Sequence, residues 1–452
     1  MKMNKVRHSL VLRIAKMIDA IMITVPFVLC WYLYYAERVD TPFYAKGNWL
    51  MVALYFLLYI TFGRVYDAFR ISMNRISEII YSQALAFLVS DGIMYIVIWL
   101  LSKHLPNVLP GCAAIAGQLI LGTIWALLAH RWYFTVFPPR RTAIIYDMRK
   151  GMTDLIESYG LNTKFDVQMT EHVEKCIVDL SILHGFQTVF LSGIHSHERN
   201  IIIKYCVAND IDVFVIPRVG DVLMSAADHM HMFHLPMLHL RRYNVNPEYL
   251  FMKRLLDIIL SGIALVILSP VMLVVAIAIK KTDGGPVFYK QVRLTKDGKT
   301  FEILKFRSMR VDAERDGVAR LSTGEKDDRV TPVGRVIRAC RLDELPQLIN
   351  ILTGDMTIVG PRAERPEIAA KYEEHLPEFA LRLQGKAGLT GYAQVYGKYN
   401  TTPYDKLQMD LMYLAHPSII EDFKIMFATV KILFMPESTE GVEDGQTTAD
   451  TV

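Results

Sequence analysis

The sequence contains few cysteines, and none of them stands in a pattern typical of a bound metal or a disulfide framework. Five cysteines are scattered along the chain, at Cys30, Cys112, Cys176, Cys206 and Cys340. An odd number without CxxC spacing argues against both a zinc site and a set of disulfides. We therefore interpret them as buried or membrane-embedded thiols.

A glycine-rich nucleotide fingerprint and a cleavable leader are also missing. The first apolar run of a predicted sheet, residues 142–146, would need GxGxxG after it to bind a dinucleotide. It is followed instead by Asp-Met-Arg-Lys-Gly at 147–151, which disfavours a nucleotide-dependent oxidoreductase. The first apolar stretch has no small-residue cleavage site and is too long for a signal peptide, so we expect it to be retained.

Large net charge is absent as well, since the formal charge is only +4. No nucleic-acid partner is therefore predicted. Hydrophobic residues make up 52% of the chain and the mean hydropathy is +0.24, which is too apolar for an ordinary soluble enzyme. Basic residues crowd beside the apolar segments, as expected next to an anionic cytoplasmic leaflet.

Four apolar stretches occupy the first third of the chain, at residues 10–35, 48–65, 79–101 and 109–136. Each approaches the roughly 20 residues needed to cross a bilayer. Asp19 and Asp91 lie inside two of them. An acid within a membrane is a functional candidate, although hydrogen bonding between helices is the simpler interpretation.

Basic residues in the short loops predict how these helices are oriented. They are abundant before the first stretch, between the second and third, and after the fourth. The topology consistent with this pattern places the N-terminus and everything after the fourth helix in the cytoplasm. The residues concerned are Lys2, Lys5, Arg7, Arg13, Arg64, Arg70, Arg75, Arg131, Arg140 and Arg141.

Short apolar runs at 142–146, 188–191 and 211–216 alternate with helical patterns such as 198–209. This alternation predicts a small Rossmann-like α/β domain over residues 138–245. A scaffolding or regulatory role is the default for it.

A fifth apolar segment, residues 255–279, should not simply cross the membrane. Lys-Arg precedes it and Lys-Lys follows it, so both flanks are typical of the cytoplasmic side. Ser269 and Pro270 lie in its middle, where proline breaks or kinks a helix and a serine hydroxyl can satisfy a freed backbone group. We predict a re-entrant helix over 253–281. The alternative is a kinked span that would place the rest of the chain outside.

The last 200 residues carry the candidate chemistry. Lys305 and Arg307 alternate with apolar neighbours, and on a strand they would share one face that suits a diphosphate. Asp343 and Glu344 are adjacent, so one carboxylate can attack a phosphate while the other binds a divalent ion. Taken alone, such a pair is more often a set of surface acids at the start of a helix.

Two further segments have the character of phosphate-binding loops. Gly360-Pro361 forms a turn that would present Arg362, whose guanidinium can contact phosphate oxygens in pairs. Residues 385–391 are rich in glycine and would either wrap a ligand or form a plain surface loop. Residues 407–414 and 419–434 are predicted to be amphipathic helices, and the tail from 436 is predicted to be disordered.

Six motifs in this order resemble those of the bacterial sugar transferase family, the monotopic polyprenyl-phosphate hexose-1-phosphate transferases. They are Lys-Arg-Leu-Leu-Asp at 253–257, Ser-Pro at 269–270, Lys-Phe-Arg-Ser-Met at 305–309, Leu-Asp-Glu-Leu-Pro-Gln at 342–347, Val-Gly-Pro-Arg at 359–362 and Gly-Leu-Thr-Gly at 388–391. The front of the chain is similar to long members that start capsule or exopolysaccharide units. One departure is Ala363, where the family often has proline.

The resemblance implies transfer of a hexose 1-phosphate from a UDP-sugar, with glucose or galactose favoured, to undecaprenyl phosphate, with release of UMP. It implies ping-pong chemistry in which Asp343 is the nucleophile and Glu344 binds Mg²⁺. Arg362 would contact phosphate, and Lys305, Arg307 and Arg338 would lie near the site. The helix break of the family would fall on Ser269 and Pro270.

The expected fold class is therefore a membrane protein with α and α/β parts. It comprises a four-helix transmembrane region (1–137), the α/β domain (138–245), a catalytic α/β domain with the re-entrant helix (246–435) and a tail (436–452). We expect a homodimer in the bacterial inner membrane, with the catalytic domain on the cytoplasmic face. Two other interpretations are an inactive scaffold of the same fold and a transporter or export component with five spans.

Overall fold

The computed structural model describes residues 2–242, 245–310, 329–397 and 401–433. It divides into two compact units, Met1–Ile216 and Pro217–Val452. The division falls inside the predicted 138–245 domain, so that the parallel sheet belongs to the first unit and the segment from Pro217 to the second. The predicted tail, 436–452, lies outside the described residues.

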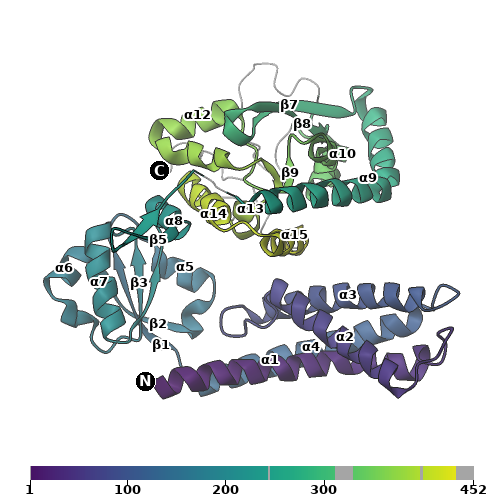
Figure 1. The fold of residues 1–452 in the computed structure, drawn as a ribbon, viewed down its shortest axis with the longest axis horizontal. Helices are drawn as coiled ribbons and strands as arrows, with labels where there is room; N and C mark the ends of the chain where they lie inside the picture. Colours follow the sequence, from purple (N-terminus) through teal and green to yellow (C-terminus); the bar gives the residue numbers. More distant parts are fainter. Residues whose placement is uncertain (1, 243–244, 311–328, 398–400, 434–452) are drawn as a thin grey trace. The chain divides into compact units, whose positions relative to one another are not determined.

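The first unit begins with four long apolar helices, as the sequence predicts. Helix α1 packs against α2 and α4, and α3 packs against the same two helices (Figure 1). With α9 of the second unit, they are the five helices of the described residues that are long and apolar enough to cross a membrane. Their bounds are α1 Lys2–Cys30, extended by a π-helical turn at Trp31–Tyr35, α2 Ala45–Val65, α3 Ile76–Leu100 and α4 Leu109–Val136.

A parallel four-stranded sheet follows in the same unit, with the strand order β2-β1-β3-β4. The three strands predicted from the sequence are present as β1, β3 and β4. The remaining strand, β2, was not predicted. Its side chains alternate between exposed and partly covered positions, which gives no continuous apolar run. The strands are β1 Arg140–Tyr146, β2 Phe165–His172, β3 Thr188–Ser192 and β4 Asp212–Val215, and the helices are α5 Met152–Ser158, α6 Val173–Val178 and α7 Ser196–Ala208 (Figure 1).

The second unit combines short strands with many helices around three small apolar cores. It opens with α8 Val219–Ser225, the hairpin β5 Asp228–Met232 and β6 Leu235–His239, and the long helix α9 Pro247–Asp283. The remaining elements are β7 Phe288–Leu294, β8 Thr300–Phe306, α10 Pro332–Ala339, the 3₁₀ turn η6 Leu342–Glu344, α11 Gln347–Thr353, β9 Thr357–Val359, α12 Pro366–His375, η7 Pro377–Gln384, β10 Gly388–Thr390, α13 Tyr392–Tyr396, α14 Pro403–Ala415 and α15 Ile419–Leu433.

The glycine-rich segment 385–391 does not form a ligand-wrapping loop. Its central residues are strand β10, which pairs in parallel with β9. A Cβ on Gly388 would collide with the backbone of Gly360. The glycine therefore permits two strands to approach closely, which corrects the interpretation of this stretch as a loop.

Helix α9 continues through Pro270, and Figure 1 shows it as two limbs that meet at a sharp bend. Proline removes the hydrogen bond to the carbonyl four residues before it, which here belongs to Val266. The Ser269 hydroxyl donates to that carbonyl at 2.8 Å. The serine thus supplies a donor to the carbonyl that the proline leaves without one. The helix ends at Gly284, whose φ of 70° closes it in the left-handed conformation.

The first limb of α9 is anchored to the rest of the unit by charged side chains. Arg254 donates to the carbonyls of Ile351 and Leu352 at 2.6 and 2.8 Å, which caps the end of α11. The buried Asp257 accepts from the hydroxyl of Thr357 at 2.7 Å and from the N–H of Ile358 at 3.0 Å. These contacts explain the Lys-Arg-Leu-Leu-Asp motif, because they fix the apolar helix to β9 and α11.

Replacing Asp257 with alanine should lower the free energy of unfolding by about 1–3 kcal/mol, because two buried donors would lose their acceptor. Thermal unfolding of the full chain in detergent measures the change. Asp228→Ala is the matched control, since Asp228 is exposed and its ion pair with the exposed Arg241 should contribute little. Equal stability of the two variants would contradict this account of the motif.

Candidate active site

The Asp343–Glu344 pair lies on the short 3₁₀ turn η6 rather than on a regular α-helix. Arg341, just before the turn, has a φ of 52°, in the left-handed region. Residues other than glycine seldom adopt this conformation, and where they do it often accompanies a functional site. The turn presents the two carboxylates as half-buried neighbours immediately before helix α11.

Lys305 approaches Glu344 from strand β8. The Lys305 Nζ lies 2.9 Å from Glu344 Oε1, and each side chain is 20% exposed. Burial alone would raise the pKa of Glu344, but the charges of Lys305 and Arg362 outweigh it and lower the pKa to about 2. Glu344 is therefore ionised over the whole physiological range.

Asp343 responds to the same surroundings in the opposite direction. Burial raises its pKa, and the negative charge of Glu344 adds to the increase, although the charges of Lys305 and Arg338 oppose it. Adjacent carboxyl groups whose pKa values are pushed apart are suited to different tasks. Here Glu344 is the permanent anion and Asp343 is the carboxyl whose charge responds to pH.

The structure brings together most of the residues that the sequence selects. Lys305 acts electrostatically on both carboxyl groups, whereas Arg338 acts on Asp343 and Arg362 acts on Glu344. Arg307 is placed differently, because β8 ends at Phe306 and does not continue the alternation. Its buried guanidinium packs against Gly285.

Two arginines, the buried Arg382 and the partly buried Arg293, hold the turn that presents Arg362, and sequence reasoning missed both. Arg382 is 3% exposed, and it donates from Nη2 to the carbonyl of Arg362 at 3.0 Å. The same nitrogen lies 2.6 Å from Asp410 Oδ2. Arg293 donates to the carbonyl of Ala363 at 3.0 Å. The sequence does place Arg382 among the apolar residues of 379–383, which is a sign that its side chain is buried.

Asn350 was also missed, although it fixes the spacing between β8 and the turn. It is 4% exposed and lies on α11, directly after the carboxylate pair. Its amide accepts from the N–H of Leu304 and donates to the carbonyl of Glu302, both at 2.9 Å. The side chain thereby joins α11 to the strand that carries Lys305.

The carboxylate pair fits a magnesium ion only if the substrate supplies further ligands. Among the described residues no group of three or more histidine, cysteine, aspartate or glutamate side chains could hold a metal. Mg²⁺ is commonly bound by one or two carboxylates together with water and substrate phosphates. Glu344, with Asp343 beside it, provides that donor set.

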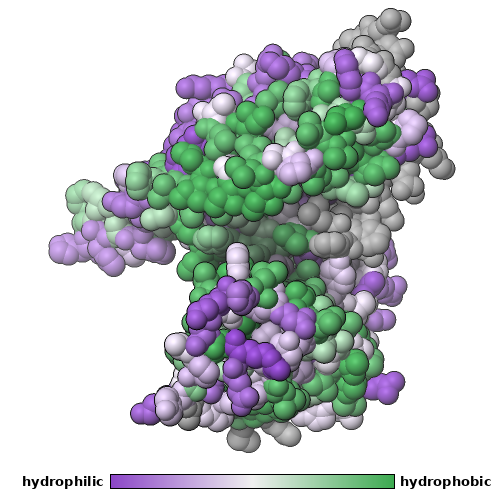
Figure 2. Space-filling view, turned by 90° about the vertical axis from the view of Figure 1, so that its right-hand side faces the viewer, coloured by the Kyte–Doolittle hydropathy of each residue, from purple (hydrophilic) through white to green (hydrophobic). Residues whose placement is uncertain are grey.

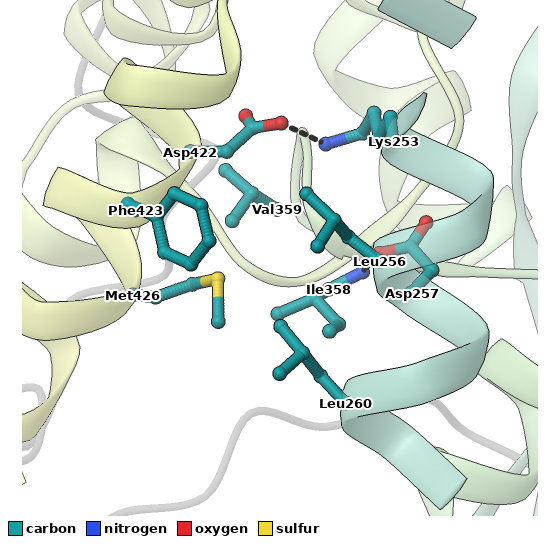
Figure 3. Close-up of a pocket in the computed structure, with 9 residues that line it drawn as sticks. All are labelled: Lys253, Leu256, Asp257, Leu260, Ile358, Val359, Asp422, Phe423 and Met426. Atoms are coloured by element: carbon teal, nitrogen blue, oxygen red, sulfur yellow. Dashed lines mark hydrogen bonds and ion pairs between the residues drawn. The ribbon is translucent and has the colours of Figure 1, made fainter. Parts of the chain in front are cut away.

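A pocket elsewhere in the unit lies between α9, β9 and α15, and does not include the carboxylate pair. Figure 3 shows the ion pair of Lys253 with Asp422 at one end, at 2.8 Å, and apolar side chains such as Leu260 and Met426 at the other. The pair is mostly buried, and the hydroxyl of Tyr413 donates to Asp422 at 2.7 Å. These contacts attach α9 to α15.

The carboxyl-terminal part of the chain matches a known family. The family model described as bacterial sugar transferase matches residues 248–436, a range that contains α9, the carboxylate pair and Arg362. All the motifs that carry the resemblance therefore lie within the matched range.

Three similar proteins illustrate the relationship. The chain is 36% identical over 233 residues to a UDP-N-acetylgalactosamine-undecaprenyl-phosphate N-acetylgalactosaminephosphotransferase of Aeromonas hydrophila, covering 50% of this chain and 53% of that protein, about half its length. It is 38% identical over 191 residues to a UDP-glucose:undecaprenyl-phosphate glucose-1-phosphate transferase of Caulobacter vibrioides. This match covers 41% of this chain and 71% of that protein. It is 40% identical over 190 residues to the exopolysaccharide production protein PSS of Rhizobium leguminosarum bv. phaseoli. This match covers 40% of this chain and 94% of that protein.

The Rhizobium protein is thus matched over nearly its whole length. Because this chain covers 94% of that relative at 40% identity and the family model matches residues 248–436, this chain belongs to the bacterial sugar transferase family.

Proposed function

We propose that the protein transfers a hexose 1-phosphate from a UDP-hexose to undecaprenyl phosphate and releases UMP. The observation that carries the proposal is the contrast within the carboxylate pair. Glu344 is held ionised by Lys305, while burial raises the pKa of Asp343. Relatives whose names describe such transfers support the reaction class.

In the first step, a carboxylate oxygen of Asp343 attacks the sugar-side phosphorus of the UDP-hexose. An O–P bond forms to Asp343 as the bond between that phosphorus and the bridging oxygen breaks, and the electron pair leaves with UMP. In the second step, a phosphate oxygen of undecaprenyl phosphate attacks the same phosphorus and displaces Asp343. A covalent intermediate divides the transfer into two simpler displacements and avoids holding the soluble and lipid substrates together.

The surrounding cations would stabilise the charge that develops on the phosphates. Arg362 is exposed at the turn and carries a guanidinium able to contact phosphate oxygens in pairs. Arg338 acts on Asp343 from α10. Glu344 would hold Mg²⁺, which when bound neutralises the diphosphate and assists departure of UMP.

The identity of the hexose is a separate part of the proposal. We favour glucose or galactose. The names of the relatives include glucose in one case and N-acetylgalactosamine in another, so a donor panel must include the N-acetylated sugars.

We further propose that the four helices of the first unit cross the bacterial inner membrane and that α9 enters and leaves it on the cytoplasmic side. The outward side chains of α9 are apolar and exposed, among them Val266, Ile267 and Val274, and Figure 2 shows extensive apolar surface on the protein. A re-entrant helix would set the carboxylate pair at the depth of a lipid phosphate. Homodimer formation and a role at the start of capsule or exopolysaccharide synthesis complete the proposal.

Asp343→Asn should reduce UMP release by roughly 10⁴-fold or more, because the amide cannot replace the attacking carboxylate. The assay contains the full chain in detergent, Mg²⁺, undecaprenyl phosphate and one UDP-sugar at a time. Asp297→Asn is the control and should retain activity with the same preferred sugar. Substantial turnover by the Asp343 variant would exclude the covalent mechanism, and no release with any sugar from folded wild type would exclude the proposed reaction.

The rate of UMP release should fall as the pH decreases through the raised pKa of Asp343, because only the ionised carboxylate attacks. Glu344, with a pKa of about 2, stays charged in this range. Lys305→Gln removes a cation that lowers the pKa of Asp343. The acid side of the pH–rate profile should therefore move to higher pH in this variant. Initial rates of UMP release across pH locate the acid side of the profile. The control is Lys290→Gln, which changes an exposed lysine paired with Glu302 and should leave the profile unchanged. A shift to lower pH in the Lys305 variant would be incompatible with this electrostatic account.

Replacing Ser269 with alanine and Pro270 with leucine should straighten α9, because leucine restores the missing N–H and removes the ring. A straight apolar helix would cross the bilayer and carry the catalytic part to the other side. A reporter fused after Leu433 should then lose its cytoplasmic signal. Ser269→Ala alone keeps the proline and should keep the wild-type signal. An unchanged reporter in the double variant would count against the proline as the cause of re-entry.

A further inference from the structure

The four helices of the first unit enclose two similar clusters, each made of an aspartate, a tyrosine and a glutamine. In the first, Asp19 of α1 is 1% exposed. Its Oδ2 accepts from the Tyr59 hydroxyl of α2 at 3.0 Å, and its Oδ1 accepts from the Gln83 amide of α3 at 2.8 Å. We call this group the Asp19 triad.

The second cluster, the Asp91 triad, repeats the arrangement with different helices. The Gln118 amide of α4 donates to the Tyr55 hydroxyl of α2 at 2.7 Å and lies 3.5 Å from Asp91 Oδ1 of α3. Tyr55 is also hydrogen-bonded to Asp91. Because Tyr55 and Tyr59 are four residues apart on α2, they lie on the same side of that helix.

Both triads have too few hydrogen-bond donors. Gln83 and Gln118 are 1% and 0% exposed, yet the side-chain oxygen of each has no hydrogen-bond partner among the described residues, and neither has Asp91 Oδ2. All three atoms are acceptors. Burying such atoms, or a carboxylate, without a partner costs free energy that proteins usually avoid.

No positive side chain of the described residues compensates for either acid. The titratable groups that act on them are Tyr59 for Asp19, and Tyr55 and the Cys30 thiol for Asp91. Lys16, one turn before Asp19, directs its Nζ over the ring of Phe69, 4.7 Å from the ring centre. In a bilayer, an acid without a cationic partner marks a functional site by default.

We propose that each triad binds one small monovalent cation, a proton or a sodium ion, between its carboxylate and its glutamine oxygen. A proton on Asp91 Oδ2, donated to Gln118 Oε1, would satisfy both of the unpartnered atoms in that triad. A sodium ion would use the same oxygens, since hard cations prefer oxygen ligands. Either ion would supply the positive charge that the triads lack. The proposal does not depend on the proposed transfer reaction.

A glycine on α4 keeps space next to the first triad. A Cβ at Gly122 would lie 3.1 Å from Gln83 Oε1 and 3.2 Å from Ile23 Cδ1. Any larger side chain at this position would therefore press on the unpartnered oxygen. Because Gly122 has no side chain, α4 does not crowd that oxygen.

The test uses the full chain in lipid nanodiscs and compares wild type with Asp19→Asn, Asp91→Asn and the double variant. Asparagine keeps the size of the side chain and supplies an N–H in place of the proposed cation. Glu37→Gln removes an exposed acid just past the first helix and is the matched control.

One arm detects protons. The infrared C=O stretch of a protonated carboxyl group is followed across pH, and bands present in wild type and in Glu37→Gln but lost in the asparagine variants identify protons on the triads. The other arm detects sodium. Thermal unfolding is measured in sodium and in choline salts at equal ionic strength, and binding predicts a sodium-dependent rise in Tm that the double variant loses.

A signal in either arm supports the proposal and identifies the cation. The proposal is overturned if both carboxyl groups stay ionised and wild type shows no sodium-dependent stabilisation. Should an asparagine variant fail to fold, Gln118→Met provides a second test, because it keeps both acids but removes one oxygen ligand. That variant should lose the signal of the Asp91 triad alone, and an unaltered signal would exclude Gln118 as a ligand.

Discussion

The ion pair between Lys305 and Glu344 is the interaction on which the candidate site depends. It joins strand β8 to the turn η6, at a distance of 2.9 Å, and both partners are largely covered. Burial would otherwise favour protonation of Glu344, so the lysine decides that this carboxyl remains an anion. That anion in turn helps to raise the pKa of Asp343. This contact and the burial of Asp343 together give two adjacent acids different chemical properties.

The same framework connects the apolar helix α9 to the carboxylate pair. Arg254 caps the end of α11, and α11 begins three residues after Glu344. Asp257 binds strand β9, which leads directly to the turn bearing Arg362. The helix that would contact lipid and the side chains that would contact phosphate are therefore attached to the same short elements. In a membrane, such an attachment would keep the site at a fixed depth.

The turn at Arg362 is supported by contacts to its backbone carbonyls. The family often has proline after this arginine, and this chain has Ala363. Here the backbone is held from behind, since Arg382 binds the carbonyl of Arg362 and Arg293 binds that of Ala363. Asp410 is 1% exposed and fixes Arg382 in turn. The conformation of the turn is thus supported by side chains that are distant in sequence.

The sequence by itself determined the features that depend on local pattern. Long apolar stretches became helices, three apolar runs became strands, and Ser269 satisfied the carbonyl freed by Pro270, because helical and strand periods and proline geometry act within a few residues. It also selected Asp343 and Glu344 as candidates. Only the tertiary structure decided that Lys305 reaches Glu344 while Arg307 packs on Gly285. It likewise placed Gly388 against Gly360 and made Arg382 a support of the site. Burial and charge between distant residues arise only when the elements pack, so no local pattern encodes them.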